Sequence, residues 1–250
     1  MKKIIIAASM LAATFVANAQ EPTLQPTRLY KPVAGNVLAE IGFLANGVGA
    51  NVTSYSNSAF VTPQLKFRYF LQDQIALRVG FNFTQQSNTT KIYEAGGSGT
   101  GFARDASSLF GLNAGLEKHF TGTGRLSTYV GADVSFQRVS AASKWENTAD
   151  GTTFSDGDTR KTRGFNNATP AVNGSFGFGL RAVAGADYYF VEKVYLGAEF
   201  GWGFIASRDV KTKDEQTVGG VTNTTETDSP GGSFNLGLNL SAGLRLGFIF

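Results

Sequence analysis

The feature that most constrains this chain is a strict alternation of side chains at its C-terminal end. From Phe234 to Phe250 every second residue is apolar, and most of the residues between them are glycine, asparagine or serine. A period of two is typical of a β-strand, because successive side chains point to opposite faces. Strands in soluble sheets usually have about five or six residues, whereas a tilted strand that crosses a membrane needs about ten. The length of the segment therefore favours a membrane-spanning strand.

The same alternation recurs upstream, in segments with one apolar face and one face rich in glycine and polar residues. Eight strands are expected, at 37–44, 64–71, 75–84, 110–120, 126–137, 176–190, 194–204 and 234–250. In lipid the apolar faces can point outward, but no water satisfies an unpaired strand edge, so the sheet must close on itself. A soluble β-sandwich would have shorter strands and more frequent turns. We predict an all-β fold, a membrane-spanning antiparallel up-and-down β-barrel of eight strands.

The connections between these strands alternate in length. Three are short, at 72–74, 121–125 and 191–193, and four are long and polar, at about 45–59, 85–107, 138–172 and 206–232. In bacterial outer-membrane barrels the short turns lie on the periplasmic side and the long loops lie outside the cell. The pattern predicts an outer-membrane location with both chain ends in the periplasm.

The N-terminal residues have the pattern of an export signal. Lys2 and Lys3 precede an apolar stretch at 4–16, and Ala17 and Ala19 give the small-residue pattern of a cleavage site. The stretch is too short to cross about 30 Å of hydrocarbon as a helix, which argues against a membrane anchor. We expect a cleaved signal peptide at 1–19, a periplasmic N-terminal extension at 20–33 and the barrel domain at 34–250.

Composition excludes several classes of partner and site. Cleavage removes two of the 22 lysines and arginines and leaves 20, against 19 acidic residues, so the basic pI carries little information. The charges form no basic stripe, and no nucleic acid is expected as a partner. The chain has no cysteine, so it has no disulfide framework, thiolate metal site or cysteine for lipid attachment.

Aromatic residues gather near both ends of the expected strands. Those near the long connections are Phe83, Phe136, Phe176, Trp202, Phe204 and Phe234, and those near the turns are Tyr69, Phe120, Tyr188, Phe190, Phe248 and Phe250. Two belts are typical of the interfaces of a membrane. The strand propensity of aromatic residues does not predict two bands.

The inner face of the predicted barrel carries ten charged residues, five of each sign. They are Glu40, Lys66, Arg68, Arg78, Glu117, Asp133, Arg181, Asp187, Glu199 and Arg245. Because buried charge is costly unless it is paired, we expect one salt-bridged cluster of Glu40, Lys66 and Arg245 and another of Arg78 and Glu117. An eight-stranded barrel is only wide enough for its own side chains. These points favour a structural plug over the alternative, a narrow porin-like channel for small solutes.

Patterns for catalysis and metal binding are weak. His119 is the single histidine, and we interpret it as a polar interface residue near Glu117 rather than as a catalytic base. We therefore expect no enzymatic activity and no cofactor, with a lipid-modifying outer-membrane enzyme as the alternative. The acidic residues near Asp150, Asp156 and Asp214 lack the spacing of a calcium loop, so no metal site is expected.

The long connections are the expected binding surface, since loops carry recognition on a rigid scaffold. In the third of them, Trp145 lies between Lys144 and Glu146. Trp145 could contact a partner or lipopolysaccharide, or it could belong to a hairpin that extends above the membrane. The expected role is structural or in surface interactions. The expected partners are outer-membrane lipid and lipopolysaccharide, the barrel-assembly machinery, and an extracellular ligand bound through the loops.

With these features the chain resembles the small eight-stranded outer-membrane barrels of the OmpA/OmpX type, from about residue 34 to the end. The most specific residues are Gly243, Leu246, Phe248 and Phe250, which resemble the C-terminal assembly signal read by the barrel-insertion machinery. Their glycine spacing departs from the commonest form of that signal. We expect no peptidoglycan-binding domain after Phe250, so the resemblance implies barrel form and membrane location and does not imply cell-wall anchoring.

Overall fold

Eight antiparallel strands close into a ring in the computed structural model, which describes residues 30–44, 63–169, 171–229, 231–237 and 243–250. The ring runs in the order β1 (Val37–Leu44), β2 (Pro63–Gln72), β3 (Ile75–Tyr93), β4 (Thr100–His119), β5 (Leu126–Glu146), β9 (Ser175–Val191), β10 (Val194–Asp209) and β14 (Gly243–Ile249). It closes at β1, where Glu40 lies opposite Lys66 of β2 on one side and opposite Gly247 of β14 on the other. The predicted eight-stranded barrel is confirmed. Within the described residues, no helix is long and apolar enough to cross a membrane.

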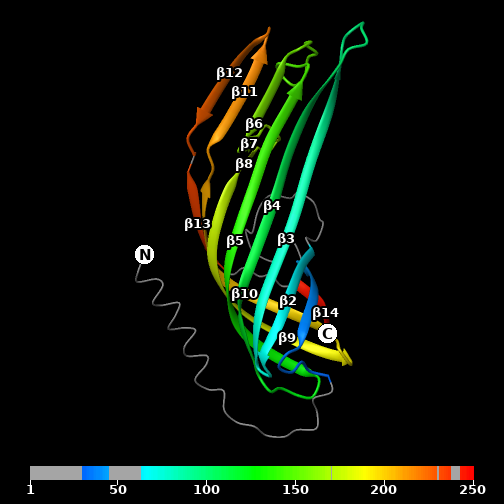
Figure 1. The fold of residues 1–250 in the computed structure, drawn as a ribbon, viewed down its shortest axis with the longest axis vertical. Helices are drawn as coiled ribbons and strands as arrows, with labels where there is room; N and C mark the ends of the chain where they lie inside the picture. Colours follow the sequence, from blue (N-terminus) through cyan, green and yellow to red (C-terminus); the bar gives the residue numbers. More distant parts are fainter. Residues whose placement is uncertain (1–29, 45–62, 170, 230, 238–242) are drawn as a thin grey trace.

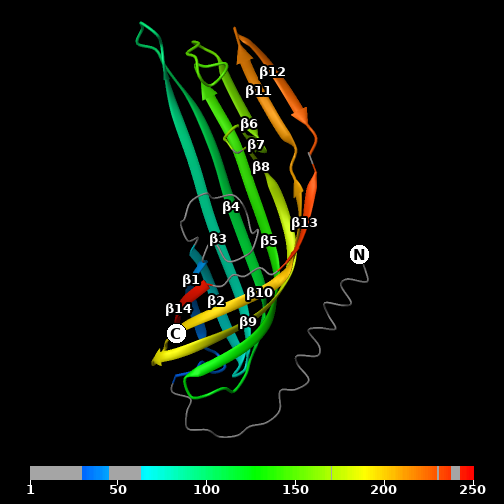
Figure 2. The same ribbon diagram turned by 180° about the vertical axis from the view of Figure 1, so that it is seen from behind.

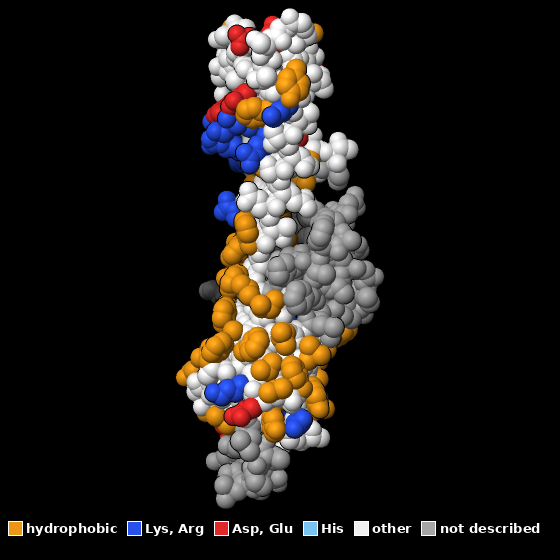
Figure 3. Space-filling model, turned by 90° about the vertical axis from the view of Figure 1, so that its right-hand side faces the viewer, with side chains coloured by type: hydrophobic (Ala, Val, Ile, Leu, Met, Phe, Trp, Pro, Cys, Tyr) orange, Lys and Arg blue, Asp and Glu red, His pale blue; other side chains and the backbone are white. Residues whose placement is uncertain are grey.

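Burial along the strands explains why this sequence forms a barrel. In β10, Tyr195 and Glu199 point inward and are buried, whereas Leu196 and Trp202 point outward and are 45% and 48% exposed. The exposed side chains are therefore the apolar ones, the reverse of a soluble sheet with one face in water. Figure 3 shows hydrophobic side chains spread over the lower part of the molecule. An apolar exterior around a polar interior is the arrangement of a barrel in lipid.

Several strands continue far beyond the barrel. Figures 1 and 2 show β3, β4 and β5 rising well above β1, β2 and β14. The added strands are β6 (Thr159–Arg163), β7 (Phe165–Asn166), β8 (Val172–Asn173), β11 (Thr212–Val218) and β12 (Val221–Thr227). Strand β13 (Gly232–Gly237) pairs with β10, as β14 does, and contains the first residues of the strand expected at 234–250. Strand β6 pairs with β5 and with β11, and β11 pairs with β12. We call the upper parts of β3, β4 and β5 (85–93, 100–107 and 140–146), together with β6, β11 and β12, the projecting sheet.

The projecting sheet corrects the expected ends of the strands: much of the long polar connections predicted at 85–107, 138–172 and 206–232 consists of paired strands. Only the tips at 94–99, 147–158 and 219–220 separate its strands. The reason is physical: above the membrane both faces of a strand can meet water, so the apolar alternation that marks the lower strands is lost while the backbone pairing continues. The expected loop at 45–59, the signal peptide at 1–19, residues 20–29 of the extension and residues 238–242 of the last strand lie outside the described residues.

The turn end of the barrel, formed by the connections at 73–74, 120–125 and 192–193, is closed by a small core. Its buried hydrophobic side chains are Leu38, Phe70, Ala76, Tyr189, Tyr195 and Ile249, with Tyr30 packed against them. The described part of the N-terminal extension has no regular structure, and Lys31 donates a hydrogen bond to the carbonyl of Thr121. This core forms a floor beneath the polar interior.

Candidate functional site

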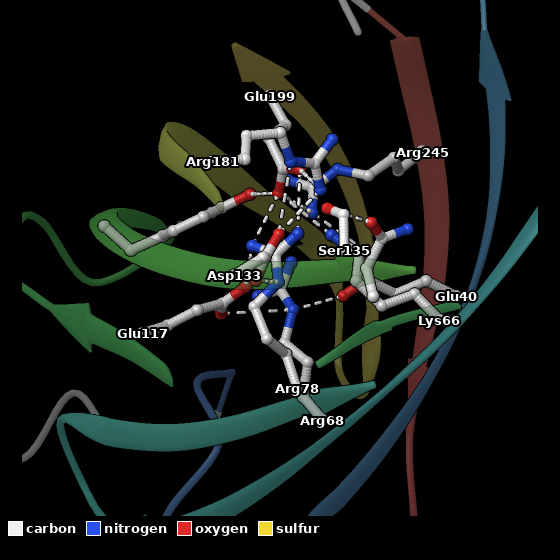
Figure 4. A network of polar contacts seen from close by, with 12 residues as sticks. Glu40, Lys66, Arg68, Arg78, Glu117, Asp133, Ser135, Arg181, Glu199 and Arg245 are labelled. Atoms are coloured by element: carbon white, nitrogen blue, oxygen red, sulfur yellow. Dashed lines mark hydrogen bonds and ion pairs between the residues drawn. The ribbon is translucent and has the colours of Figure 1, made fainter. Parts of the chain in front are cut away.

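The polar interior of the barrel is a continuous network of ion pairs. All ten charged residues expected to point inward lie within it, and each of the eight ring strands contributes at least one. Nine of the ten are at most 6% exposed, and the side chain of Arg181 is 11% exposed. Figure 4 shows the side chains converging on the middle of the lumen from all sides.

Glu199 of β10 is the most connected carboxylate. It accepts hydrogen bonds from Lys66 at 2.9 Å, from Arg78 at 2.8 and 3.0 Å, and from the hydroxyl of Tyr129 at 2.6 Å. Arg245 approaches the same carboxylate at 3.3 Å. Groups from four other strands therefore meet on one side chain within the lumen.

Arg68 and Arg245 join three further acids of the network. Arg68 contacts Glu40, donates to Asp187 at 2.6 Å and lies 3.3 Å from Glu117. Arg245 donates to Glu40 at 2.9 Å and to Asp187 at 2.8 Å. Each of these carboxylates thus faces more than one cation. Such charge-assisted hydrogen bonds are the strong ones in protein interiors.

The predicted pairs are present, and others were not foreseen. Lys66 lies 3.4 Å from Glu40, and Arg78 lies 2.5 Å from Glu117. The contacts of Arg78 and Lys66 with Glu199, across the lumen, were missed. Strand neighbours can be inferred from a sequence, but partners across a lumen depend on the tilt and stagger of the strands.

Glycines on the inner face make room for these long side chains. A Cβ atom added to Gly197 would lie 2.4 Å from the Asp187 carboxylate and 2.8 Å from the Arg245 guanidinium. A Cβ atom on Gly247 would lie 2.1 Å from the Tyr195 ring. The glycine-rich inner faces noted in the sequence are thus the space that the network occupies.

Aromatic rings line the lower boundary of the network, and sequence reasoning did not assign them a role. The guanidinium of Arg68 lies 4.9 Å from the ring of Tyr129 and 5.7 Å from that of Tyr195. A cation over an aromatic face is attracted by the ring quadrupole. The inward parity of both tyrosines was visible in the strand pattern and could have identified them.

His119 is a correction to the expected interface position. Its side chain is buried in the lumen, with ring centroids 4.9 Å from Phe70 and 5.1 Å from Tyr129. Its Nδ1 lies 3.0 Å from the Ser127 hydroxyl and its Nε2 lies 3.1 Å from the Glu117 carboxylate. The side chain points inward because it lies on the same face of β4 as Glu117, two residues away.

A serine, a histidine and a carboxylate in this order are the components of a nucleophile activated by a base. Here Ser127 is 3% exposed, and Glu117 also holds Arg78 and Arg68. Ser127, His119 and Glu117 are therefore within hydrogen-bond distance of one another in the order that such a nucleophile requires, but the Ser127 side chain is buried. Among the described residues, no group of three metal-ligating side chains is close enough to hold a metal ion.

Comparison with known proteins places this barrel in a family. The model of the OmpA-OmpF-like porin family matches residues 50–216, more than half of the chain. The chain belongs to this family. Together with the closed ring and its apolar exterior, this membership identifies an outer-membrane β-barrel protein. A search of the curated proteins found no match.

Three solved structures to which the chain is similar are distant in sequence. The N-terminal β-barrel domain of OprF from Pseudomonas aeruginosa is 17% identical, with 88% of this chain and 100% of that chain covered and a TM-score of 0.37. A major outer membrane protein from Thermus thermophilus is 12% identical, with 86% and 98% covered and a TM-score of 0.43. The outer membrane protein OprG from Pseudomonas aeruginosa is 12% identical, with 88% and 98% covered and a TM-score of 0.38.

In this OmpA-OmpF-like barrel, Trp145 belongs to the projecting sheet. This position agrees with the interpretation of Trp145 as part of a hairpin that extends above the membrane. The Arg160 guanidinium of β6 lies 5.0 Å from the Trp145 ring and forms a two-pronged contact with Asp214 of β11, at 2.7 and 3.0 Å. The hydrogen bond that Arg160 donates to the Asp214 carboxylate raises the pKa of Arg160. Trp145 and Arg160 thus tie β5, β6 and β11 together on the face continuous with the lumen.

The residues of the expected assembly signal lie in β14 and at its end. Gly243 pairs with Leu44 of β1 and with Glu199 of β10. Leu246, Phe248 and Phe250 are exposed on the apolar exterior, with Phe250 72% exposed. Their recognition by the assembly machinery stays a prediction.

Proposed function

We propose that this family member is a non-enzymatic outer-membrane barrel with a closed lumen, whose projecting sheet faces outside the cell and whose termini are periplasmic. The observation that carries the proposal is the charge network that fills the barrel. Its five acidic and five basic side chains contact one another within the lumen. The role that remains for such a protein is structural or in interactions at the cell surface.

The energetics of the network support a plug. A solute that passed through the lumen would have to separate Arg78 from Glu199 and Arg68 from Asp187, whose contacts are 2.6 to 3.0 Å long. Breaking one partner out of a buried pair costs about 3–5 kcal/mol, and several pairs would have to open together. Below them the core around Tyr189 and Tyr195 forms a second barrier.

Planar-bilayer recording of the purified barrel tests the proposal. We expect no steady open state for the wild-type protein. The double variant Arg78→Ser, Glu199→Ser removes two long side chains of opposite sign from the centre. Adding Tyr189→Ser and Tyr195→Ser opens the core below it, and we expect this combined variant to conduct. Lys161→Ser, in the exposed part of β6, should behave like the wild type. A large and steady wild-type conductance in most insertions would overturn the plug and favour the porin-like alternative.

An enzyme is the second candidate because of the contacts between Ser127, His119 and Glu117. Burial of the Ser127 hydroxyl argues against it, since a nucleophile must reach its substrate. We expect no product when the barrel is incubated with lipid A or with phospholipid. Turnover that is abolished in both His119→Ala and Ser127→Ala would contradict this expectation.

A further inference from the structure

The two faces of the projecting sheet carry different electrostatics. On the face continuous with the lumen, the cation Arg160 is neutralised by Asp214. On the opposite, outward face, Arg104 of β4 lies opposite Lys144 of β5, and Lys144 lies opposite Lys161 of β6. Three cations therefore stand side by side across three neighbouring strands. Like charges directly opposite one another in a sheet are destabilising.

A second row of cations lies one step closer to the membrane. Arg163 of β6 lies opposite Lys213 of β11. Three acids on this face cover only part of the charge. Glu146 pairs with Lys144, Glu215 pairs with Lys213 and lies opposite Lys161, and Glu226 lies opposite Lys213. Within the residues that the structure describes, Arg104, Lys161 and Arg163 are exposed and form no ion pair with an acid. The five cations of the two rows outnumber these three acids, so this face of the projecting sheet carries a net positive charge.

The outward face continues down into the apolar exterior. Arg138 of β5 lies opposite both Phe110 and Phe176, and Arg208 of β10 lies opposite Phe176 on its other side. All four side chains are exposed. Cations therefore flank the upper aromatic belt, where lipid headgroups meet a barrel. Figure 3 shows lysine and arginine side chains gathered above the hydrophobic band on one side of the molecule.

The distance between the two levels indicates the kind of ligand. Lys144 follows Arg138 by six residues along β5, which is about 20 Å at the rise of a strand. The headgroup region of a bilayer adds only about 5–8 Å to each side of the hydrocarbon. A phospholipid at the level of Arg138 cannot reach the row that contains Lys144. A lipid with anionic groups on both its headgroup and an attached sugar chain can reach both levels.

We propose that the outward face of the projecting sheet binds such an anionic glycolipid of the outer leaflet, the chemistry of lipopolysaccharide. Arg138 and Arg208 contact its lipid phosphates, and the row Arg104, Lys144 and Lys161 contacts anionic groups on its sugar chain. Arginine and lysine are the residues suited to phosphate recognition. The inference rests on the proposed orientation of the sheet toward the cell exterior.

Binding of labelled rough-type lipopolysaccharide to the purified barrel in zwitterionic detergent tests the proposal. We expect the triple variant Arg104→Gln, Lys144→Gln, Lys161→Gln to bind about one hundredfold more weakly than the wild type, as expected for three surface cations near an anionic lipid. The matched control Lys118→Gln, Arg125→Gln, Lys193→Gln removes the same charge from the turn end and should bind as the wild type does. Circular dichroism and heat-modifiable gel mobility establish that each variant is folded.

Further arms identify the source of the anionic groups. Phosphatidylglycerol should bind the triple variant and the wild type equally, because it does not reach the upper row. Equal lipopolysaccharide binding by the triple variant and the wild type, or an equal loss in the control variant, overturns the proposal. A soluble polyphosphate that binds as tightly as the glycolipid also overturns the proposal, because it carries anionic groups without a lipid. Both ends of the barrel are accessible in detergent, so a reversed orientation or an open lumen leaves the binding result unchanged.

Discussion

At the scale of single residues, the network depends most on Glu199, which balances Lys66, Arg78 and Arg245 and accepts the Tyr129 hydroxyl. Glu199→Gln keeps the shape of the side chain and removes its charge. The three cations are then left with excess positive charge in a buried site, and we expect a loss of about 3–5 kcal/mol in the free energy of unfolding. Urea titration of the barrel folded in lipid vesicles, followed by tryptophan fluorescence, measures the loss.

A compensating substitution separates charge balance from lost packing. Lys66 contacts only Glu199 and Glu40 among the described acids, so Lys66→Met in the Glu199→Gln background restores neutrality. The double variant should be more stable than the sum of the two single effects predicts, by about 0.5–3 kcal/mol. Glu226→Gln, on the exposed strand β12, should change stability by less than about 0.5 kcal/mol. A Glu199→Gln barrel that unfolds at the wild-type urea concentration contradicts the central place of this carboxylate.

At the scale of elements, the tip at 147–158 between β5 and β6 is organised by Asp150. Its carboxylate accepts hydrogen bonds from the amides of Thr152 at 2.8 Å and Thr153 at 2.7 Å and from the Thr153 hydroxyl at 2.9 Å. These donors, the Thr153 amide foremost, hold the pKa of Asp150 below its usual value. Because the folded pKa is lowered, the stabilisation is present above the ordinary pKa of aspartate and is lost as the pH falls through the folded value.

The tip should therefore loosen in acid. Hydrogen-exchange protection of the Thr152 and Thr153 amides should decrease below about pH 4, the ordinary pKa of aspartate. In Asp150→Ala the same protection should already be low at neutral pH. Asp156→Ala, an exposed acid in the same tip, is the control and should leave both amides protected. Protection that does not change with pH in the wild type would show that the carboxylate does not organise the tip.

The membrane-spanning parts of the strands could be predicted from the sequence almost to the residue. The segment expected at 176–190 is β9, Ser175–Val191, and the one expected from 194 is β10, which begins at Val194. The prediction works because lipid surrounds the barrel and the lumen is polar. One face of each strand must therefore be apolar and the other polar, and the side chains alternate along the whole membrane-spanning part. The continuation of β3 to Tyr93 could not be predicted, because residues such as Thr89 and Thr90 meet water and need no alternation.

The alternation of side chains along each strand predicted which charged residues point into the lumen, but it did not predict all of their ion-pair partners. Asp133 and Arg181 are direct neighbours on β5 and β9 and lie 2.7 Å apart. The contact between Arg78 and Glu199 crosses the lumen, and neither strand pairs with the other. The three-dimensional stagger of the ring decides such contacts, and a single sequence does not give it.

At the scale of the whole molecule, a closed barrel below is joined to an open sheet above. Among the described residues, each ring strand of the barrel pairs on both sides, whereas the projecting sheet ends at β12 and at the upper part of β3. An open edge is compatible only with water, where backbone groups can be hydrated. Strand β12 is exposed along its whole length and consists of threonine, valine, asparagine and glutamate. The open sheet therefore belongs to one aqueous side of the membrane, and the proposed side is the cell exterior.

Limited digestion with a glutamate-specific protease tests on which side of the membrane the projecting sheet lies. Glu94 lies in the tip between β3 and β4, and Glu192 lies in the turn between β9 and β10; both are exposed. We expect cleavage after Glu94 in intact cells, and cleavage after Glu192 only once the outer membrane is permeabilised. Glu94→Gln should abolish the first fragment and leave the second. Cleavage after Glu192 with Glu94 protected in intact cells would reverse the orientation and would remove the projecting sheet from the glycolipid leaflet that its outward cations are proposed to bind.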